Sequence, residues 1–341
     1  MIITKIRQIK VAKFVILQSI PSLLIMDFTT KVPIPKSKFP IDYQSKILSF
    51  GSCFAENMAC KFDYYKFQNS CNPFGILFHP IAIENSISRI INLELFSEKD
   101  LFFNNERWHN FELHSDLSNP DKEALLIEIN DLLVATNKQI KEASHCIITY
   151  GTSWVYRNKQ TNKVVANCHK VPQTNFDKEL LLVSDIEKAI QNTILLIEKI
   201  NPSCNLIFTI SPVRHIKDGF VENQQSKANL IAALHATVAS KNAPSTYFPS
   251  YEIMMDELRD YRFYAEDLLH PSQVAIDYIW ERFVESSVAG GAIITMSEVE
   301  AIQRDLSHRP FNPTSESYKK FQIQLDIKIN NVKSKFPFMN F

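Results

Sequence analysis

Glycine is the residue that this chain uses least in comparison with other proteins. Only 6 glycines occur in 341 residues, whereas average usage of roughly 7% would give about four times as many. A chain with so little glycine is expected to keep it where a Cβ atom would clash or where other residues avoid the backbone conformation. Gly51, Gly75 and Gly151 lie in the short motifs considered below, so we expect those motifs to be sites.

Net charge and paired cysteines are also lacking. Lys+Arg and Asp+Glu balance at 37 each, so no net field would attract nucleic acid or an anionic membrane surface. The 6 cysteines contain no C-x-x-C pair, and a chain of this length needs no disulfide framework. A zinc site through Cys168 and His169 is disfavoured because adjacent residues rarely bind one ion together. We therefore expect a cytoplasmic protein that binds neither metal nor nucleic acid.

Residues 1–25 have a different character from the rest of the chain. Basic residues precede an apolar stretch at 14–25, which resembles the n- and h-regions of a signal peptide. Gln18, Ser19 and Pro21 interrupt that stretch, no small-residue cleavage site follows, and the stretch is too short to span a bilayer. We interpret residues 1–25 as an extension outside the domain, with export as the alternative, and expect no membrane span.

From residue 26 to residue 290, strand-like and helix-like segments alternate, which is typical of a parallel sheet covered by helices on both faces. The predicted class is therefore α/β: a three-layer α/β/α sandwich with a mostly parallel central sheet, hairpin insertions and a helical C-terminal tail. Strands are predicted at 46–50, 146–150, 206–210 and 247–248, a hairpin at 101–114, and helices at 55–67, 80–95, 124–142, 184–200, 224–240 and from 271.

Two helices carry clear apolar faces. A capping box, Ser184-x-x-Glu187, predicts the start of one helix at Ser184, and Pro271 predicts the first turn of another. Their predicted buried faces are Ile186, Ile190, Ile194 and Ile197 in the first and Ile276, Ile279, Trp280 and Phe283 in the second.

The tail, residues 291–341, is a solvated helical segment with one apolar stripe: Tyr318, Phe321, Leu325, Ile329 and Val332. Such a stripe must be covered. We expect it to pack back on the domain, and oligomerisation is the alternative.

A serine follows the first predicted strand at once, in the run Gly51-Ser52-Cys53. A serine in a turn between a strand and a helix projects its hydroxyl at the carboxyl edge of the sheet, where open α/β folds place their crevices. The helix N-terminus favours negative charge near the amides of Ser52 and Cys53, as an oxyanion site requires. The alternative is that Ser52 is an ordinary helix N-cap.

An Asp–His pair stands near the other end of the domain. Asp267 and His270 lie three residues apart in a turn before the helix at Pro271. A catalytic histidine needs one ring nitrogen facing the serine and a carboxylate on the other, and D-x-x-H supplies both from one loop. The alternative is a histidine at a helix N-cap beside a solvated aspartate. Because parallel strands end at one edge, Ser52 and His270 can meet there.

The order of motifs is specific to a known family. The motifs are GSCFAEN at 51–57, NPFGI at 72–76, YGTSWVY at 150–156, ANCHKVP at 166–172, SPVRHIKDG at 211–219 and EDLLHPS at 266–272. They cover nearly everything after Met26, and with them the chain resembles the GSCFA-domain family and, through it, the SGNH (GDSL-like) hydrolase superfamily. The resemblance implies Ser52 as nucleophile with Asp267 and His270 as its partners.

The resemblance also implies oxyanion donors: the Ser52 backbone, a glycine that we place at Gly75, and a third block. SGNH enzymes carry G-x-N-D in that third block, but this chain has Gly151-Thr152-Ser153-Trp154 and lacks the asparagine. Removal of one such donor costs about 3–4 kcal/mol of transition-state stabilisation. The candidates to replace it are the hydroxyls of Thr152 and Ser153 and the side chain of Asn72.

The function expected from these motifs is that of an esterase or acyltransferase that works through an acyl-serine and needs no cofactor. The residues expected to contact an ester of a carbohydrate or other polar metabolite are Phe74, Trp154, Tyr156, His169, Arg214 and His215. Salt bridges that hold loops would explain the last three equally well. The alternative function is an inactive SGNH-like module that binds a glycan or a partner. A third hypothesis is a thioesterase that depends on Cys53, which is disfavoured because adjacent side chains diverge on such a turn.

Overall fold

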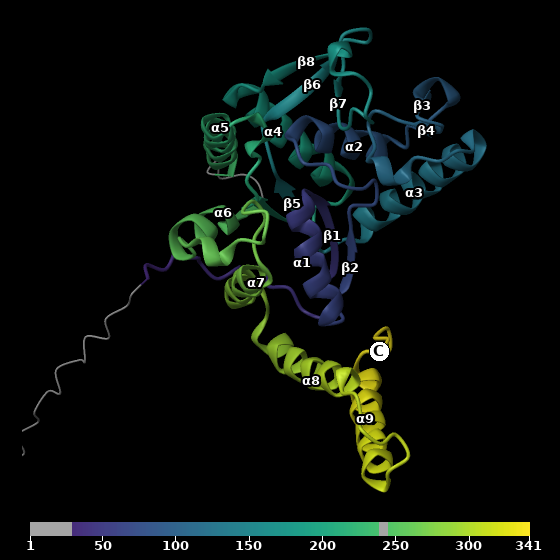
Figure 1. Ribbon diagram of the computed structural model, residues 1–341, viewed down its shortest axis with the longest axis vertical. Helices are drawn as coiled ribbons and strands as arrows, with labels where there is room; N and C mark the ends of the chain where they lie inside the picture. Colours follow the sequence, from purple (N-terminus) through teal and green to yellow (C-terminus); the bar gives the residue numbers. More distant parts are fainter. Residues whose placement is uncertain (1–28, 239–244) are drawn as a thin grey trace, which may run out of the picture. The chain divides into compact units, whose positions relative to one another are not determined.

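A parallel sheet of five strands forms the centre of the computed structural model, which describes residues 29–238 and 245–341. The strand order is β10-β9-β5-β1-β2 and every neighbouring pair is parallel. All carboxyl ends therefore lie at one edge (Figure 1). The bounds are Lys46–Gly51 for β1, Gln68–Cys71 for β2, His145–Tyr150 for β5, Asn205–Ile210 for β9 and Ser245–Phe248 for β10. The predicted extension, residues 1–25, lies outside the described residues.

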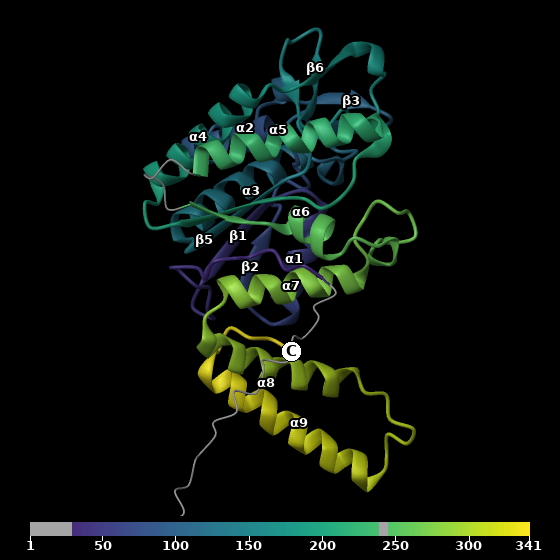
Figure 2. The same ribbon diagram turned by 90° about the vertical axis from the view of Figure 1, so that its left-hand side faces the viewer.

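Helices cover both faces of this sheet. Leu48, Ile148 and Phe208 face one apolar core, and their strand neighbours Ile47 and Ile147 face another, because successive side chains of a strand point to opposite faces. Figure 2 shows α2 to α5 on one side and α1 and α7 on the other, which confirms the predicted three-layer sandwich. The helices are α1 Cys53–Tyr64, α2 Pro80–Asn92, α3 Lys122–Glu142, α4 Val183–Ile200, α5 Phe220–Val238, α6 Ser250–Glu252 and α7 Gln273–Ser287.

The predicted apolar faces of α4 and α7 are buried, as expected from their helical spacing. Both helices begin within two residues of the predicted positions, but with different caps. α4 begins at Val183, one residue before Ser184, and its N-cap Leu182 has no side chain that could accept a hydrogen bond. Ser272 caps α7 by accepting from the amide of Ala275, so Pro271 precedes the helix.

The chain also forms two small antiparallel sheets, which are inserted between elements of the central sandwich. Strands β3 (Phe102–Asn104) and β4 (Arg107–His109) form the hairpin that the alternating pattern predicts. A sheet of β6, β7 and β8, bounded by Trp154–Asn158, Val164–Val165 and Phe176–Leu180, was not predicted. It begins four residues after β5 ends and so stands beside the candidate site.

Two helices form the tail: α8 (Gly290–Ser307) and α9 (Glu316–Lys335). Val332 of the predicted stripe is buried, and Leu325 and Ile329 pack against the same apolar core. Beyond α9, the ring of Phe336 lies 5.0 Å from that of Tyr43, so the chain end returns to the domain.

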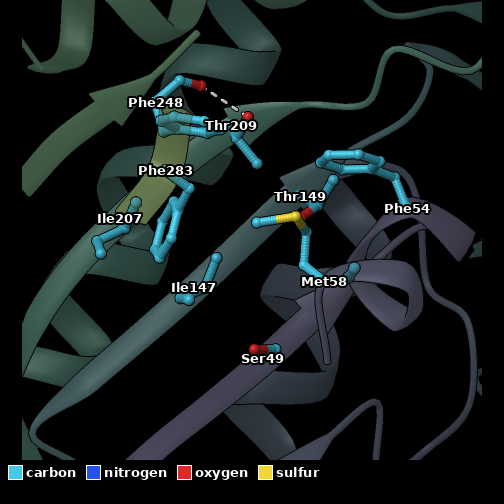
Figure 3. Close-up of a pocket in the computed structure, with 10 residues that line it drawn as sticks. Ser49, Phe54, Met58, Ile147, Thr149, Ile207, Thr209, Phe248 and Phe283 are labelled. Carbon is cyan, nitrogen blue, oxygen red and sulfur yellow. Dashed lines mark hydrogen bonds between the residues drawn. The ribbon is translucent and has the colours of Figure 1, made fainter. Parts of the chain in front are cut away.

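The space directly beneath the carboxyl edge is closely packed. Figure 3 shows a small cavity there, where Phe54 and Met58 of α1 face Ile147 and Thr149 of β5. Its volume is about 10 Å³, the space of about one water molecule. This cavity is therefore too small to hold a ligand larger than a water molecule.

The core contact of α8 generates a stability prediction. Ile302 is 1% exposed in the core and Ile294 of the same helix is 68% exposed. We expect Ile302→Ala to lower the free energy of unfolding by about 2–5 kcal/mol, because it leaves a cavity as well as losing burial. The matched control, Ile294→Ala, is expected to change it by less than about 0.5 kcal/mol. Urea unfolding followed by tryptophan fluorescence measures both, and equal losses would contradict the packing.

Candidate active site

Ser52 lies at the carboxyl end of β1 as the N-cap of α1. Its Oγ accepts the N–H of Phe54 at 3.3 Å, and its own N–H donates to Thr149 O at 3.2 Å. The side chain is buried, with the residue 1% exposed. In this conformation the serine therefore caps its helix, as the alternative interpretation expects, while standing at the edge that a nucleophile needs.

Glycine is required immediately before this serine. Gly51 has a φ of +145°, and a Cβ atom there would lie 2.3 Å from Thr149 O of the neighbouring strand. Residues other than glycine rarely adopt that backbone conformation, and their Cβ atoms do not approach a carbonyl oxygen so closely. The scarcity of glycine thus pointed correctly to Gly51 as a position where backbone meets backbone.

Asp267 and His270 form a close pair. Asp267 Oδ2 lies 2.6 Å from His270 Nδ1, and Asp267 Oδ1 accepts the amides of Leu269 and His270 at 2.9 and 3.0 Å. The His270 amide, then its ring and the Leu269 amide, lower the pKa of Asp267 to about 2. Both side chains are 45% exposed. The carboxylate holds Nδ1 and leaves Nε2 of His270 available to take a proton.

The loop that carries this pair is fastened to the end of β9. The N–H of Arg214 donates to Leu269 O at 3.1 Å, and Arg214 Nη1 donates to Leu268 O at 3.3 Å. Arg214 therefore holds this loop through backbone carbonyls rather than through the salt bridge that the alternative interpretation expected. The loop after β9 and the Asp–His loop lie together, with β5 between β9 and the strand that ends at Ser52. Among the described residues, Ser52 and His270 share no direct hydrogen bond.

The residues predicted to complete the oxyanion site already have partners. Asn72 Oδ1 accepts the Gly51 amide at 2.8 Å, and its Nδ2 donates to Glu56 at 3.3 Å. The N–H of Gly75 donates to Asn72 O at 2.8 Å. The hydroxyls of Thr152 and Ser153 both contact Ser226 of α5 and are buried with it. All of these groups therefore have hydrogen-bond partners within the protein in this conformation, and one of the two N–H groups of Asn72 Nδ2 bonds to Glu56.

A groove of about 610 Å³ adjoins the third block. Trp154, Tyr156 and His215, all predicted to contact substrate, line it. Phe74 does not, because it is 2% exposed in the apolar core. His169 does not either: its ring bonds to Asn110 O and Ser115 Oγ, and burial lowers its pKa to about 4.

Sequence reasoning missed Lys227 of α5. This lysine is 1% exposed, and its Nζ donates to Gly151 O at 2.6 Å and to Ser211 O at 2.7 Å, the carbonyls that follow β5 and β9. Burial lowers its pKa from 10.5 to about 7 against the opposing effect of Cys53. A lysine in a polar, alanine-rich helix is ordinarily solvated, so nothing in the pattern marked it.

Within residues 29–238 and 245–341, no group of three or more His, Cys, Asp or Glu side chains is placed to hold a metal ion. No helix in the same residues is long and apolar enough to cross a membrane.

The fold and this edge define a parallel α/β protein with a serine at the end of its first strand and an Asp–His pair in its last loop. Residues 46–283 match the GSCFA family, and residues 299–341 match the family described as GSCFA domain protein, C-terminal domain. The chain therefore belongs to the GSCFA family, as its motifs suggested. A comparison with curated proteins found no match.

Lys227 predicts a specific pH dependence of stability. Its folded-state pKa of about 7 lies below the ordinary 10.5, so between these values the unfolded chain binds the extra proton and unfolding becomes less favourable as pH rises. We expect the unfolding free energy of the wild type, minus that of Lys227→Met, to increase by up to about 1.4 kcal/mol per pH unit above pH 7 and to be flat below pH 6.

Urea unfolding of both proteins between pH 5.5 and 9.5 measures this difference. Lys163→Met, which removes an exposed lysine, is the control and should run parallel to the wild type. Parallel curves for Lys227→Met as well would show that Lys227 titrates as a solvated lysine.

Proposed function

We propose that this protein is a serine hydrolase or acyltransferase of the SGNH type, acting through an acyl-serine on Ser52. The observation that carries the proposal is the 2.6 Å contact between Asp267 Oδ2 and His270 Nδ1, on a loop tied to the sheet edge at which Ser52 lies. The contact fixes the tautomer in which Nε2 is the base.

The reaction begins when Ser52 Oγ attacks the ester carbonyl and passes its proton to His270 Nε2. The tetrahedral intermediate collapses, the bond to the leaving oxygen breaks, and His270 returns the proton to that oxygen. Water or a second alcohol then attacks the acyl-serine by the same route in reverse. Asp267 orients the ring throughout and stabilises the imidazolium.

The groove beside the third block fits the leaving or accepting alcohol. Trp154 and Tyr156 present aromatic rings there, alongside the polar side chains of Asn167, Gln173 and Lys217. Rings combined with hydrogen-bonding groups suit a carbohydrate or a similarly polar alcohol. We propose that the substrate is an ester of such a compound. We also propose that the protein acts in the cytoplasm.

A second candidate function is a binding module without catalysis. The observation that favours it is the burial of Ser52, 1% exposed, together with its role as helix cap. Catalysis requires this serine to leave its cap and to be uncovered. The cysteine mechanism has less support, because burial, aided by Glu56, raises the pKa of the Cys53 thiol and disfavours the reactive thiolate.

Covalent labelling separates these functions. We expect a fluorophosphonate probe to label the wild type and Cys53→Ala at Ser52, and to leave Ser52→Ala unlabelled, because the probe reports an activated serine hydroxyl. Intact mass and peptide mapping locate the adduct. An unlabelled wild type would support the binding module, and a label on Cys53 would support the cysteine mechanism.

The Asp–His contact makes a second prediction for hydrolysis of a chromogenic acetyl ester. We expect Asp267→Asn to lower kcat by about 10³- to 10⁴-fold, because an amide in this position favours the wrong tautomer of His270. Glu266→Gln is the control: it makes the same chemical change at the neighbouring exposed residue and should leave kcat within about twofold. Equal rates for the two variants would remove Asp267 from the mechanism.

A further inference from the structure

The chain lacks one oxyanion donor, and the three side chains expected to replace it are engaged elsewhere. Thr152 and Ser153 bond to Ser226, and Asn72 bonds to Gly51 and Glu56. The candidate for a replacement is a polar group near Gly151 that has no hydrogen-bond partner among the described residues. Buried polar groups without partners are rare, and each one requires an explanation.

His215 has such a group. Its Nε2 is buried and forms no hydrogen bond within the described part of the chain. The same atom lies 3.2 Å from the point that a Cβ on Gly151 would occupy, so glycine at this position leaves room for the ring. The ring stacks on Phe78, with centroids 6.1 Å apart, and lines the groove.

The strand register puts Gly151, against which His215 lies, close to Ser52. Gly51 pairs with Thr149, and the N–H of Ser52 donates to the carbonyl of that same Thr149, two residues before Gly151. Parallel strands are about 4.8 Å apart and rise about 3.3 Å per residue. Gly151 therefore stands one residue beyond the position opposite Ser52, and His215 Nε2 lies beside Gly151.

The surroundings keep this imidazole uncharged. Burial, together with the nearby charges of Lys227 and His270, lowers the pKa of His215 to about 3. A neutral ring with its proton on Nε2 is a donor that cannot act as a competing base for Ser52. Its unpaired state destabilises the resting site, and a hydrogen bond formed as charge develops on the substrate relieves that cost in the transition state.

We propose that His215 donates its Nε2–H to the carbonyl oxygen of the ester as that oxygen becomes negative, in place of the missing third-block asparagine. This inference rests on the proposed acyl-serine function. Phe78, which is partly exposed and covers the ring, is the side chain that the substrate displaces to reach Nε2.

Three substitutions at this position test the donor. His215→Phe keeps a ring against Phe78 and removes the donor, so we expect kcat to fall by about 10²- to 10³-fold with KM within about threefold. His215→Gln carries an amide N–H near the position of Nε2 and should recover activity to within about tenfold of the wild type. His215→Asn places its amide near the position of Nδ1 and should not. The control is His235→Phe, at an exposed histidine of α5, which should retain wild-type kcat.

The outcomes separate the inference from the function on which it rests. A wild type whose Ser52 is not labelled by the fluorophosphonate would overturn both. A labelled wild type with full turnover in His215→Phe, or with equal losses in the Gln and Asn variants, would overturn the role of His215 alone. Circular dichroism and urea midpoints check each fold, and if His215→Phe does not fold, the ranking of Gln above Asn decides.

Discussion

The approach of Gly51 to the neighbouring strand is the constraint on which the candidate site depends. A side chain at that position would overlap the carbonyl of Thr149, so only glycine lets β1 run beside β5 to the sheet edge and turn at once into α1. The same carbonyl then accepts the amide of Ser52. The serine is thereby fixed relative to β5, and everything built on the ends of β5 and β9 is fixed relative to the serine.

Lys227 links the ends of the next two strands, β5 and β9. Its ammonium group bridges the carbonyls of Gly151 and Ser211, and among the described residues it has no carboxylate partner. A buried charge held only by carbonyl dipoles is expensive, which is why its pKa falls so far. This lysine lies at the carboxyl edge together with His215, and its charge, together with burial, lowers the pKa of that ring and keeps it neutral.

Much of the fold could be predicted from periodicity alone. The strands β1, β5 and β9 are buried apolar runs, and the faces of α4 and α7 follow helical spacing, so local pattern and tertiary burial agree. The start of α4 was predicted to within one residue, but its cap was not, because the helix begins at Val183 and so includes Ser184 in its first turn. The sheet of β6, β7 and β8 has short, partly buried strands. Its local signal is weak: a run of aromatic and β-branched residues from Trp154 to Tyr156.

Site residues could be predicted where the local sequence determines their contacts. They could not be predicted where the contacts depend on how distant segments pack. Asp267 and His270 form their contact within one turn, so their spacing is sufficient to predict it. Phe74 lies in a recognisable motif but packs in the core, because a motif does not specify which way a ring points. Lys227 becomes unusual only through burial by segments far away in sequence, and no local pattern encodes that.

The distribution of free and occupied polar atoms bears on whether the site is catalytic. Thr152, Ser153 and Asn72 have the bonded arrangement expected of a structural edge. Within the described residues, Nδ1 of His270 is bound to Asp267, and the buried Nε2 of His215 has no hydrogen-bond partner. Leaving a buried ring nitrogen unpaired lowers the stability of the free protein, and a ligand that bonds to this atom would recover that loss. Such a bond would contribute to catalysis, and not to binding alone, only where it becomes stronger as charge develops on the ligand, because only an interaction that is stronger in the transition state lowers the barrier.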